Sequence, residues 1–363
     1  MTNSPEVNTP DTSATRTHQS DVTSVPTSWV GPVRISGNVM DDEVSIPLAT
    51  YETPLWPSCG RGAKISRMID GGITCTFVGE KMTRSVLFEL ESAAAAVTAK
   101  QDIEARLEQL QTVVSESSRF AKLVDIHFQI AARLLIVRFD FETGDASGHN
   151  MATLASERLM SYLMEQMPEL GYGSISANFC TDKKTSAVNG LLGRGKYMIA
   201  EAVIPEPIVR ERLRTTAARL AQLNERKNLI GSIMAGSLRS ANAHYANMLL
   251  AFYLATGQDA ANIVEGSQGV TQVEALDDGS VRFSCTLPNL IVGSVGNGKG
   301  LDFVEENLRR LGCKEDREPG ENARRLAACC AAIVWCGELS LLAAQTNPGE
   351  LMATHVQIER AKS

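Results

Sequence analysis

The pattern of apolar and polar positions divides the chain into a strand-rich first part and a helix-rich second part. Short runs rich in β-branched residues at 30–35 and 44–49 predict two strands around a turn. Beyond residue 205, helical spacing of apolar residues predicts helices at 207–226, 233–256, 303–311 and 322–344, with strands at 281–287 and 290–292. The helices at 233–256 and 322–344 are apolar on most sides, so we expect both to be buried. Gly257 suits the end of the first of these two helices.

Residues 86–177 form a block with its own rhythm. The pattern predicts a strand, a helix, two strands and a second helix, at 86–90, 93–115, 122–131, 133–141 and 151–167. With one more strand this order is the split βαβ, or ferredoxin-like, arrangement. We therefore expect 86–177 to fold around a core of its own.

Composition narrows the class of protein. Hydrophobic residues make up 44% and charged residues 21% of the 363 residues, which is ordinary for a soluble protein. The net charge of -7 argues against general nucleic-acid binding, so an anionic ligand must meet a local basic cluster. Eight cysteines without a C-x-x-C pair suggest reduced, buried thiols, as in a cytoplasmic protein, rather than disulfides or a zinc site.

The apolar runs predict neither a membrane span nor a secretion signal. Runs such as 248–255 are too short to cross a bilayer, and the N-terminus has no apolar core behind a basic start. Residues 1–25 are rich in Thr, Ser, Pro and Asn, which predicts a disordered leader. We expect a soluble, cytoplasmic protein.

The charged loop at 178–184 places Lys183 and Lys184 between the two parts of the chain. Taken alone, these lysines favour a solvated basic turn over a site. The segment 190–196 has the spacing of a phosphate-binding loop, but Tyr197 stands where Ser or Thr should hold magnesium, so we reject that reading. Asp259 alone suits a helix N-cap, and His355 near the terminus suits a solvated side chain.

Three glycine-containing segments suggest anion sites without establishing them. The segment 58–65 reads either as the entry to a helix with two cations or as an ordinary turn. The turn at 144–150 runs into a helix and suits a pyrophosphate or a ribose. The loop at 293–300 lacks the dinucleotide fingerprint spacing.

Taken together, the segments resemble the catalytic region of the 3-hydroxy-3-methylglutaryl-CoA reductase family, class I type, over roughly residues 29–360. Each motif is weak alone, and their order makes the set specific. They include A-T-Y-E-T at 49–53, S-x-x-R-G at 58–62, G-D-A-x-G-x-N-M at 144–151, N-F-C-T-D-K-K at 178–184, N-A-H-x-A-N at 242–247, A-T-G-Q-D-A-A-N at 255–262 and P-G-E-N-A-R at 319–324.

The resemblance implies an α+β fold: a large mixed helix/sheet substrate domain with an inserted ferredoxin-like, NADP-binding domain. The large domain would comprise 26–85 and 178–355, with a catalytic loop at 178–190. The small domain would be 86–177, between a leader at 1–25 and a tail at 356–363.

The implied reaction reduces hydroxymethylglutaryl-CoA to mevalonate and CoA with two NADPH, through a hemithioacetal and mevaldehyde. The family's catalytic residues fall on Glu52, Lys183, Asp259 and His355. Lys183 would stabilise the developing oxyanion, and Glu52, its pKa raised by burial beside Asp259, would donate a proton. Asp259 would hold Lys183, and His355 would protonate the CoA thiolate from a closing tail.

The resemblance also assigns ligand residues and partners. Substrate and CoA would contact Ser58, Arg61, Lys64, Arg84, Ser176, Asp182, Lys184 and Asn247. NADPH would contact Ser118, Arg119, Phe120, Asp145, Gly148, Asn150, Gly293, Gly296 and Gly298, with Arg119 on the 2′-phosphate. A homodimer or dimer of dimers with shared active sites is implied, without a metal, a nucleic acid or a membrane.

Several positions depart from the family pattern. Ser147 and His149 replace two methionines beside the expected cofactor, and Lys299 replaces a threonine in the glycine loop. Two alternatives stay open: a relative that reduces another short acyl-CoA or uses NADH, and a non-catalytic homologue that binds acyl-CoA or nucleotide.

Overall fold

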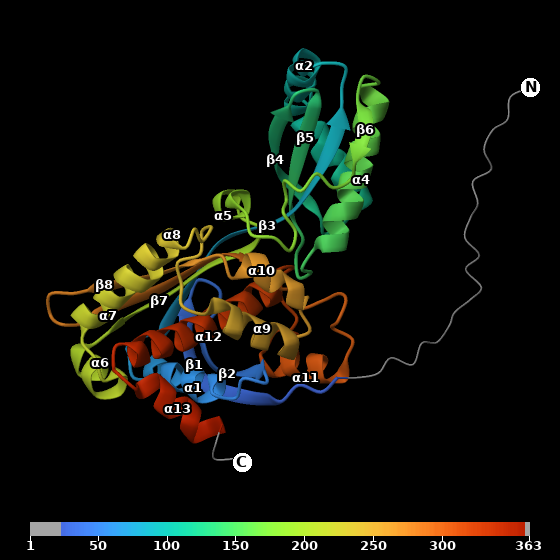
Figure 1. Ribbon diagram of the computed structural model, residues 1–363. Helices are drawn as coiled ribbons and strands as arrows, with labels where there is room; N and C mark the ends of the chain where they lie inside the picture. The colour runs from blue at the N-terminus through green and yellow to red at the C-terminus, as the bar shows by residue number, and fades with distance from the viewer. Residues whose placement is uncertain (1–22, 360–363) are drawn as a thin grey trace, which may run out of the picture.

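The computed structural model describes residues 23–359, apart from the side chains at 354, 355 and 357–359. The predicted leader therefore falls almost wholly outside the described residues. Figure 1 shows a large body with a smaller, elongated body standing on it. Each body has its own hydrophobic cluster: one is built almost entirely from residues 82–170 and the other from the remaining buried residues. The expected separate core of the 86–177 block is thus present.

The small body is an antiparallel sheet covered by helices. Its strands lie in the order β6–β3–β5–β4, and its helices come from the segments between them. The elements are the second half of β3 (Ile73–Glu89), then α2 (Ala93–Glu104), α3 (Leu107–Ser117), β4 (Lys122–Ala131), β5 (Leu134–Glu142), α4 (His149–Gln166) and β6 (Gly171–Ser174). The single helix predicted at 93–115 is wrong in detail, because the chain breaks at Ala105 and Arg106.

The large body is built on the strand order β2–β1–β3–β7–β9–β8. Its strands besides β3 are β1 (Thr27–Gly37), β2 (Asp42–Ala49), β7 (Gly195–Ile204), β8 (Val270–Ala275) and β9 (Val281–Leu290). β3 belongs to both bodies: its first half pairs with β7, its second half pairs with β5, and a register shift marks a bulge between Phe77 and Gly79. One strand of 17 residues therefore joins the two bodies.

The helix α12 (Glu321–Gln345) is the centre of the large body. It packs against α1 (Leu55–Ser66), α9 (Tyr245–Ala255) and β7. Nineteen of its 25 residues are buried, as the apolar pattern predicted. It is also long and apolar enough to span a bilayer, but 94% of its apolar window is buried inside the protein, which is the behaviour of a core helix. All eight cysteines are free and buried, which confirms the expectation of reduced, buried thiols.

Two helix predictions in the second part of the chain are wrong. Residues 207–226 form α6 (Glu206–Leu213) and α7 (Ala217–Leu223), separated by Arg214 with φ +56°, and the chain continues into η1 (Asn224–Gly231) and α8 (Ser232–Met234). Residues 233–256 are helical mainly in α9, because Gly236 and Arg239 take positive φ values between the two ends. Ile233 and Met234 are 75% and 82% exposed instead of buried. The described chain is completed by α5 (Ala187–Leu192), η2 (Ala260–Asn262), α10 (Ile263–Gly266), α11 (Asp302–Arg310) and α13 (Glu350–Glu359).

Candidate active site

The loop that returns from the small body to the large one is held in an unusual backbone conformation. Asn178, Thr181 and Lys183 have φ values of +57°, +35° and +56°. For residues with a Cβ such conformations cost ~1–2 kcal/mol each, so neighbouring groups must hold them. The Ser85 hydroxyl accepts hydrogen bonds from the backbone N–H groups of Phe179 and Cys180 at 2.9 and 3.1 Å. The loop is thereby fixed to β3 just before Lys183.

Lys183 and Asp259 form an ion pair, with 2.8 Å between Nζ and Oδ2. The hydrogen bond that Lys183 donates to Asp259 raises the pKa of Lys183. Burial alone would raise the pKa of Asp259, but the hydrogen bonds from Lys183 and from the backbone of Ala261 lower it. Both groups are therefore charged at neutral pH. The two side chains are 41% and 44% exposed, so a ligand can reach the ammonium group.

A largely buried ion network contacts the backbone of Lys183. Arg194, 2% exposed, contacts Glu265 Oε1 at 2.6 Å through Nη1 and Asp182 Oδ1 at 2.9 Å through Nη2. The backbone N–H of Lys183 donates to the same Glu265 oxygen at 3.2 Å. Burial raises the pKa of Glu265, and Arg194 opposes that rise. Arg194 thus connects the loop to α10, the short helix that follows Asp259 and η2 in the sequence.

Sequence reasoning missed Arg194 and Glu265 as functional residues. A signal was present in both cases. Arg194 lies between two glycines just before a buried strand, and Glu265 follows Ile263 and Val264 in an otherwise apolar turn. Charged residues in such apolar surroundings are rarely buried unless they are paired. Lys196, the lysine of the segment with phosphate-loop spacing, forms an ion pair with Glu80 at 3.1 Å in the core. This pairing agrees with our rejection of the phosphate-loop interpretation.

His149 lies beside the same network and comes from the small body. It begins α4 directly after Gly148, whose φ of +92° and contact with Thr143 leave no room for a Cβ. Its Nε2 atom is 3.7 Å from Asp182 Oδ1, beyond hydrogen-bonding distance. Burial, followed by the charge of Arg194, lowers the pKa of His149 to about 4. The ring is therefore neutral at neutral pH.

A neutral buried histidine makes stability depend on pH. Between pH 6.5 and about 4 the unfolded chain binds a proton at His149 that the folded chain excludes, so stability falls as the pH falls through this window. The difference between the two pKa values corresponds to a loss of about 3 kcal/mol. We expect a His149→Gln variant to lose about that much less stability than the wild type between pH 7 and pH 4, as measured by urea unfolding. Parallel stability curves for the two proteins would contradict this expectation.

Two segments predicted to bind the cofactor pack against each other. The backbone N–H of Ser294 donates to the Asp145 carbonyl at 2.8 Å, and a Cβ on Gly293 would lie 2.3 Å from the Ser147 nitrogen. The Asp145 carboxylate accepts hydrogen bonds from the backbone N–H groups of Gly320 and Ala323 and so fixes the start of α12. The structure therefore brings the turn at 144–150 and the loop at 293–298 together, with Asn150 exposed beside them.

The remaining predicted cofactor residues lie further out on the small body. The Ser118 hydroxyl accepts from the backbone N–H groups of Phe120 and Ala121, which forms a tight turn. Arg119 and Phe120 are exposed, with the guanidinium carbon 5.6 Å from the ring centre. No carboxylate pairs with Arg119 among the residues that the structure describes. Its charge is therefore available to an anion.

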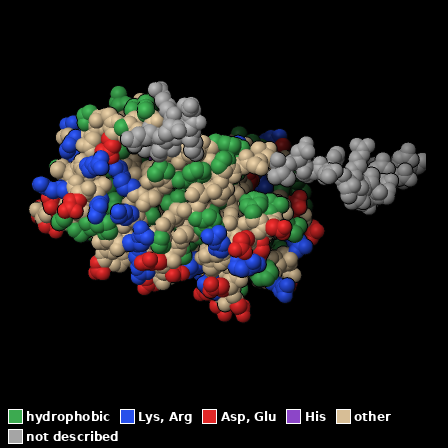
Figure 2. Space-filling model, turned by 90° about the horizontal axis from the view of Figure 1, so that it is seen from below, with side chains coloured by type: hydrophobic (Ala, Val, Ile, Leu, Met, Phe, Trp, Pro, Cys, Tyr) green, Lys and Arg blue, Asp and Glu red, His purple; other side chains and the backbone are tan. Residues whose placement is uncertain are grey.

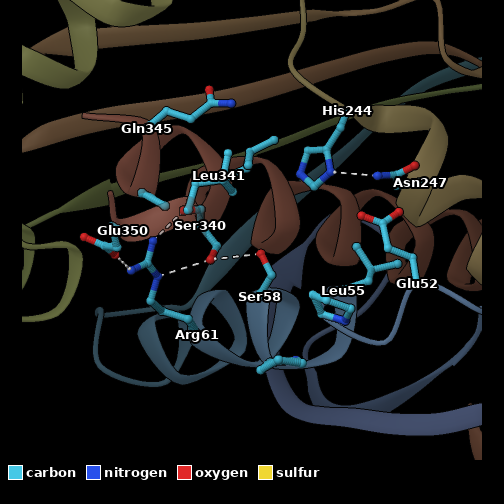
Figure 3. Close-up of a pocket in the computed structure, with 14 residues that line it drawn as sticks. Glu52, Leu55, Ser58, Arg61, His244, Asn247, Ser340, Leu341, Gln345 and Glu350 are labelled. Atoms are coloured by element: carbon cyan, nitrogen blue, oxygen red, sulfur yellow. Dashed lines mark hydrogen bonds and ion pairs between the residues drawn. The ribbon is translucent and has the colours of Figure 1, made fainter. Parts of the chain in front are cut away.

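A second cluster of predicted residues lines a cavity of about 350 Å³ between α1, α9, α12 and α13. Figure 3 shows Glu52, His244 and Asn247 at one end of it and Arg61 and Glu350 at the other. The Ser58 hydroxyl donates to Ser340 Oγ at 3.1 Å, and Arg61 contacts Glu350 at 2.7 Å. Of the residues described, neither Lys183 nor Asp259 lines this cavity. Within one copy Glu52 therefore lines a cavity to which the Lys183–Asp259 pair does not contribute.

Two expectations about this cavity need correction. Glu52 is exposed, so burial of Glu52 beside Asp259 is wrong for a single copy. Helix α1 begins at Leu55, so Arg61 and Lys64 project from the body of a helix rather than from its N-terminus. Arg61 and Lys64 also line a neighbouring hollow of about 340 Å³ together with Arg212 and Arg214. The side chain of His355, in α13, lies outside the described residues.

The last three predicted substrate residues surround the loop. Arg84 donates to Thr153 Oγ1 at 3.0 Å through Nε. Lys184 is exposed and donates to the backbone carbonyl of Asp182 at 3.0 Å. The Ser176 carbonyl accepts from the Ser174 hydroxyl at 3.0 Å, just before the loop.

Comparison with known proteins gives a consistent result. The family model described as hydroxymethylglutaryl-coenzyme A reductase matches residues 21–360. The 3-hydroxy-3-methylglutaryl-coenzyme A reductase of Pyrococcus horikoshii is 43% identical over 325 residues, which are 89% of this chain and 78% of that protein. Reductase 3 of Solanum tuberosum is 41% identical over 342 residues, which are 93% of this chain and 58% of that protein.

A solved structure has the same fold. It is the class II 3-hydroxy-3-methylglutaryl-CoA reductase from Streptococcus pneumoniae bound to NADPH in open conformations. It superposes with a TM-score of 0.71 at 21% identity, over 91% of this chain and 87% of that one. The likeness confirms a mixed α/β architecture.

Proposed function

This chain belongs to the hydroxymethylglutaryl-coenzyme A reductase family, and we infer that it reduces 3-hydroxy-3-methylglutaryl-CoA to mevalonate and CoA with two NADPH. The observation that carries the inference is the exposed ion pair between Lys183 and Asp259. Lys183 stands on a loop that is held in left-handed backbone conformations. A cation fixed in this way, with its ammonium group open to a ligand, is what a developing oxyanion requires.

Each reduction transfers a hydride from NADPH to the carbonyl carbon, which places negative charge on the carbonyl oxygen. Lys183 donates hydrogen bonds to that oxygen, and Asp259 keeps the ammonium group charged and oriented. Glu52 supplies a proton to the oxygen. His355 protonates the CoA thiolate when the hemithioacetal collapses to mevaldehyde, before the second reduction.

The residues on the small body fit NADPH. Arg119 is an exposed guanidinium without a carboxylate partner among the described residues, and guanidinium groups bind phosphate with two hydrogen bonds. The buried Nε2 atom of His149, between the small body and the loop, also has no hydrogen-bond partner in the part of the chain that the structure describes. We assign 86–177 as an inserted ferredoxin-like, NADP-binding domain, on the basis of its βαββαβ element order and the strand order β6–β3–β5–β4.

The CoA moiety fits the basic hollow beside the cavity. Its lining has four basic residues and one acidic residue, on a chain whose net charge is -7: Arg61, Lys64, Arg212, Arg214 and Glu211. Figure 2, which views the molecule from the end carrying α1 and α13, shows basic side chains gathered on the side where α6 lies. We propose that the phosphates bind there, while the thioester reaches toward Glu52 through the cavity.

The division of the site within one copy supports a homodimer or dimer of dimers with shared active sites. Figure 1 shows α10, next to Asp259, on the side of the large body that faces the small body, whereas α1 and α13 lie at the opposite end. Leu229, Ile230, Ile233 and Met234 form an exposed apolar face on η1 and α8. A second copy that covers this face and brings its Glu52 to Lys183 completes the quartet.

We propose a cytoplasmic location for the enzyme.

The direct test is NADPH oxidation by the purified chain with hydroxymethylglutaryl-CoA. Two NADPH consumed per thioester, with mevalonate and free CoA as products, supports the proposal. Oxidation only with another acyl-CoA, or only with NADH, would favour a divergent reductase. Binding of acyl-CoA or nucleotide without oxidation of any cofactor would favour a non-catalytic homologue.

Subunit complementation tests the shared site. Glu52→Gln and Lys183→Met variants should each be nearly inactive, whereas a mixture that has exchanged subunits should recover about a quarter of the wild-type activity. The reason is that half of the random dimers are mixed, and each mixed dimer holds one intact site of two. The measurement is NADPH oxidation after co-refolding or co-expression. A mixture as inactive as its components would show that each site comes from one copy.

A further inference from the structure

His149 is a titratable group that the mechanism above does not use, although it lies at the catalytic loop. Its Nε2 atom is buried and has no hydrogen-bond partner among the described residues. A buried polar atom without a partner costs free energy, so such an atom commonly marks the place of a ligand. The ring comes from the small body, and the loop that it faces carries Lys183.

The surroundings determine which form of the ring is present. Asp182 Oδ1 is 3.7 Å from Nε2. Arg194 and Lys183 face the ring with positive charge, and Asp182 and Asp259 face it with negative charge. Burial keeps the ring neutral, so only one nitrogen carries a proton. We assign the proton to Nε2, because the Asp182 carboxylate 3.7 Å away attracts an N–H and repels a lone pair.

A neutral N–H donor suits an uncharged acceptor. Anionic groups have better partners nearby, because Lys183, Lys184 and Arg84 already offer full positive charges around the loop. His149 is flanked by Gly148 and Asn150, two of the predicted cofactor residues. The nicotinamide ring must also lie beside Lys183, since hydride has to reach the carbonyl carbon that this lysine faces.

From this arrangement we propose that His149 is a positioning residue whose Nε2–H donates a hydrogen bond to the carboxamide oxygen of the nicotinamide ring. The inference rests on the proposed function, because it requires NADPH at this site. It departs from the family pattern described above, which has methionine at this position, and a thioether cannot donate a hydrogen bond. His149 then fixes the ring orientation from the small body while Lys183 holds the acceptor oxygen.

Binding of two NADPH analogues tests this assignment without turnover. In the thionicotinamide analogue the carboxamide oxygen is sulfur, which is a poor acceptor, whereas in the 3-acetylpyridine analogue the oxygen is kept and the amide nitrogen is lost. We expect the wild type to bind NADPH about three- to tenfold more tightly than the thionicotinamide analogue in calorimetric titrations, the range of one neutral hydrogen bond. In His149→Phe this ratio should fall to about one.

Two further variants complete the test. His149→Gln keeps a side-chain N–H and should retain most of the preference for NADPH over the thionicotinamide analogue. His127→Gln, in β4, is the control histidine: its Nε2 lies 3.1 Å from Asp140 within the small body, so the analogue ratio should stay at the wild-type value. The ratio of NADPH to the 3-acetylpyridine analogue should be the same in the wild type and in His149→Phe.

The outcomes separate this inference from the proposed function. An unchanged thionicotinamide ratio in His149→Phe, or a changed 3-acetylpyridine ratio, overturns the assignment even if the wild type reduces hydroxymethylglutaryl-CoA. A wild type that neither binds nor oxidises NADPH overturns the proposed function and this inference with it. A general loss of affinity for all three dinucleotides in His149→Phe would indicate a structural role and would also overturn the assignment.

Discussion

Replacing Lys183 by methionine is expected to lower kcat by about two to three powers of ten. The variant removes the ammonium group that we propose faces the developing oxyanion, and it leaves the methylene stem in place. Folding should change little, because the side chain is 41% exposed and its ion pair with Asp259 is open to solvent. The measurements are NADPH oxidation with hydroxymethylglutaryl-CoA and the thermal midpoint of unfolding.

Two controls sharpen this expectation. Lys100→Met removes a lysine of comparable exposure from α2, where it pairs with Glu104 at 2.8 Å, and should leave the rate unchanged. Lys183→Arg keeps the positive charge but replaces the compact ammonium group by a planar guanidinium. Its kcat should lie between that of the wild type and that of Lys183→Met. A Lys183→Met enzyme with near-normal turnover would remove this lysine from the mechanism.

The largest expected effect on stability belongs to Arg194. In Arg194→Met the buried Glu265 carboxylate loses its cation, and breaking a buried ion pair from one side costs about 3–5 kcal/mol. The backbone of Lys183 hydrogen-bonds to the same carboxylate, so turnover should fall together with stability. Urea unfolding and the NADPH oxidation rate measure the two effects.

The matched control for Arg194 is Arg210→Met. Arg210 pairs with Glu206 on the exposed face of α6 and is itself 68% exposed, so its loss should change stability by less than about 1 kcal/mol. The double variant Arg194→Met/Glu265→Met removes both buried charges and should recover part of the lost stability, while turnover stays low. Equal stability of Arg194→Met and the wild type would show that the pair contributes nothing to the fold.

Much of the fold could be predicted from local pattern. The paired strands β1 and β2, the separate core of the small body and the burial of α12 all follow from apolar residues at the period of one element. The errors fall where the backbone leaves regular geometry. The positive φ of Arg214 ends α6, and those of Gly236 and Arg239 interrupt a helix that the apolar spacing alone would continue. The exposed Ile233 and Met234 follow the same spacing as a buried helix, because periodicity does not reveal which faces a partner covers.

The site was predicted unevenly for a related reason. The motifs located Lys183 and Asp259, which the fold brings to within 2.8 Å of each other across 76 residues of sequence. Arg194 and Glu265 were not predicted, because their roles depend on the ion-pair partners that the fold gives them. A single sequence does not show which residues will be paired. Glu52 was expected beside Asp259, and a single copy exposes it instead. The roles assigned to the catalytic, cofactor and substrate residues all remain predictions.

The continuity of β3 limits how the two bodies move. A hydrogen-bonded strand resists stretching and shear, so the small body cannot slide along the large one. The ladder with β7 is interrupted at the bulge between Phe77 and Gly79, which is where the strand bends most easily. A Cβ on Gly79 would meet nothing within 4 Å, so a larger side chain would fit there without a clash. A rotation of the small body about this bulge therefore has to break the hydrogen bonds of the Asp145 carboxylate with the backbone of Gly320 and Ala323, which tie the small body to the start of α12.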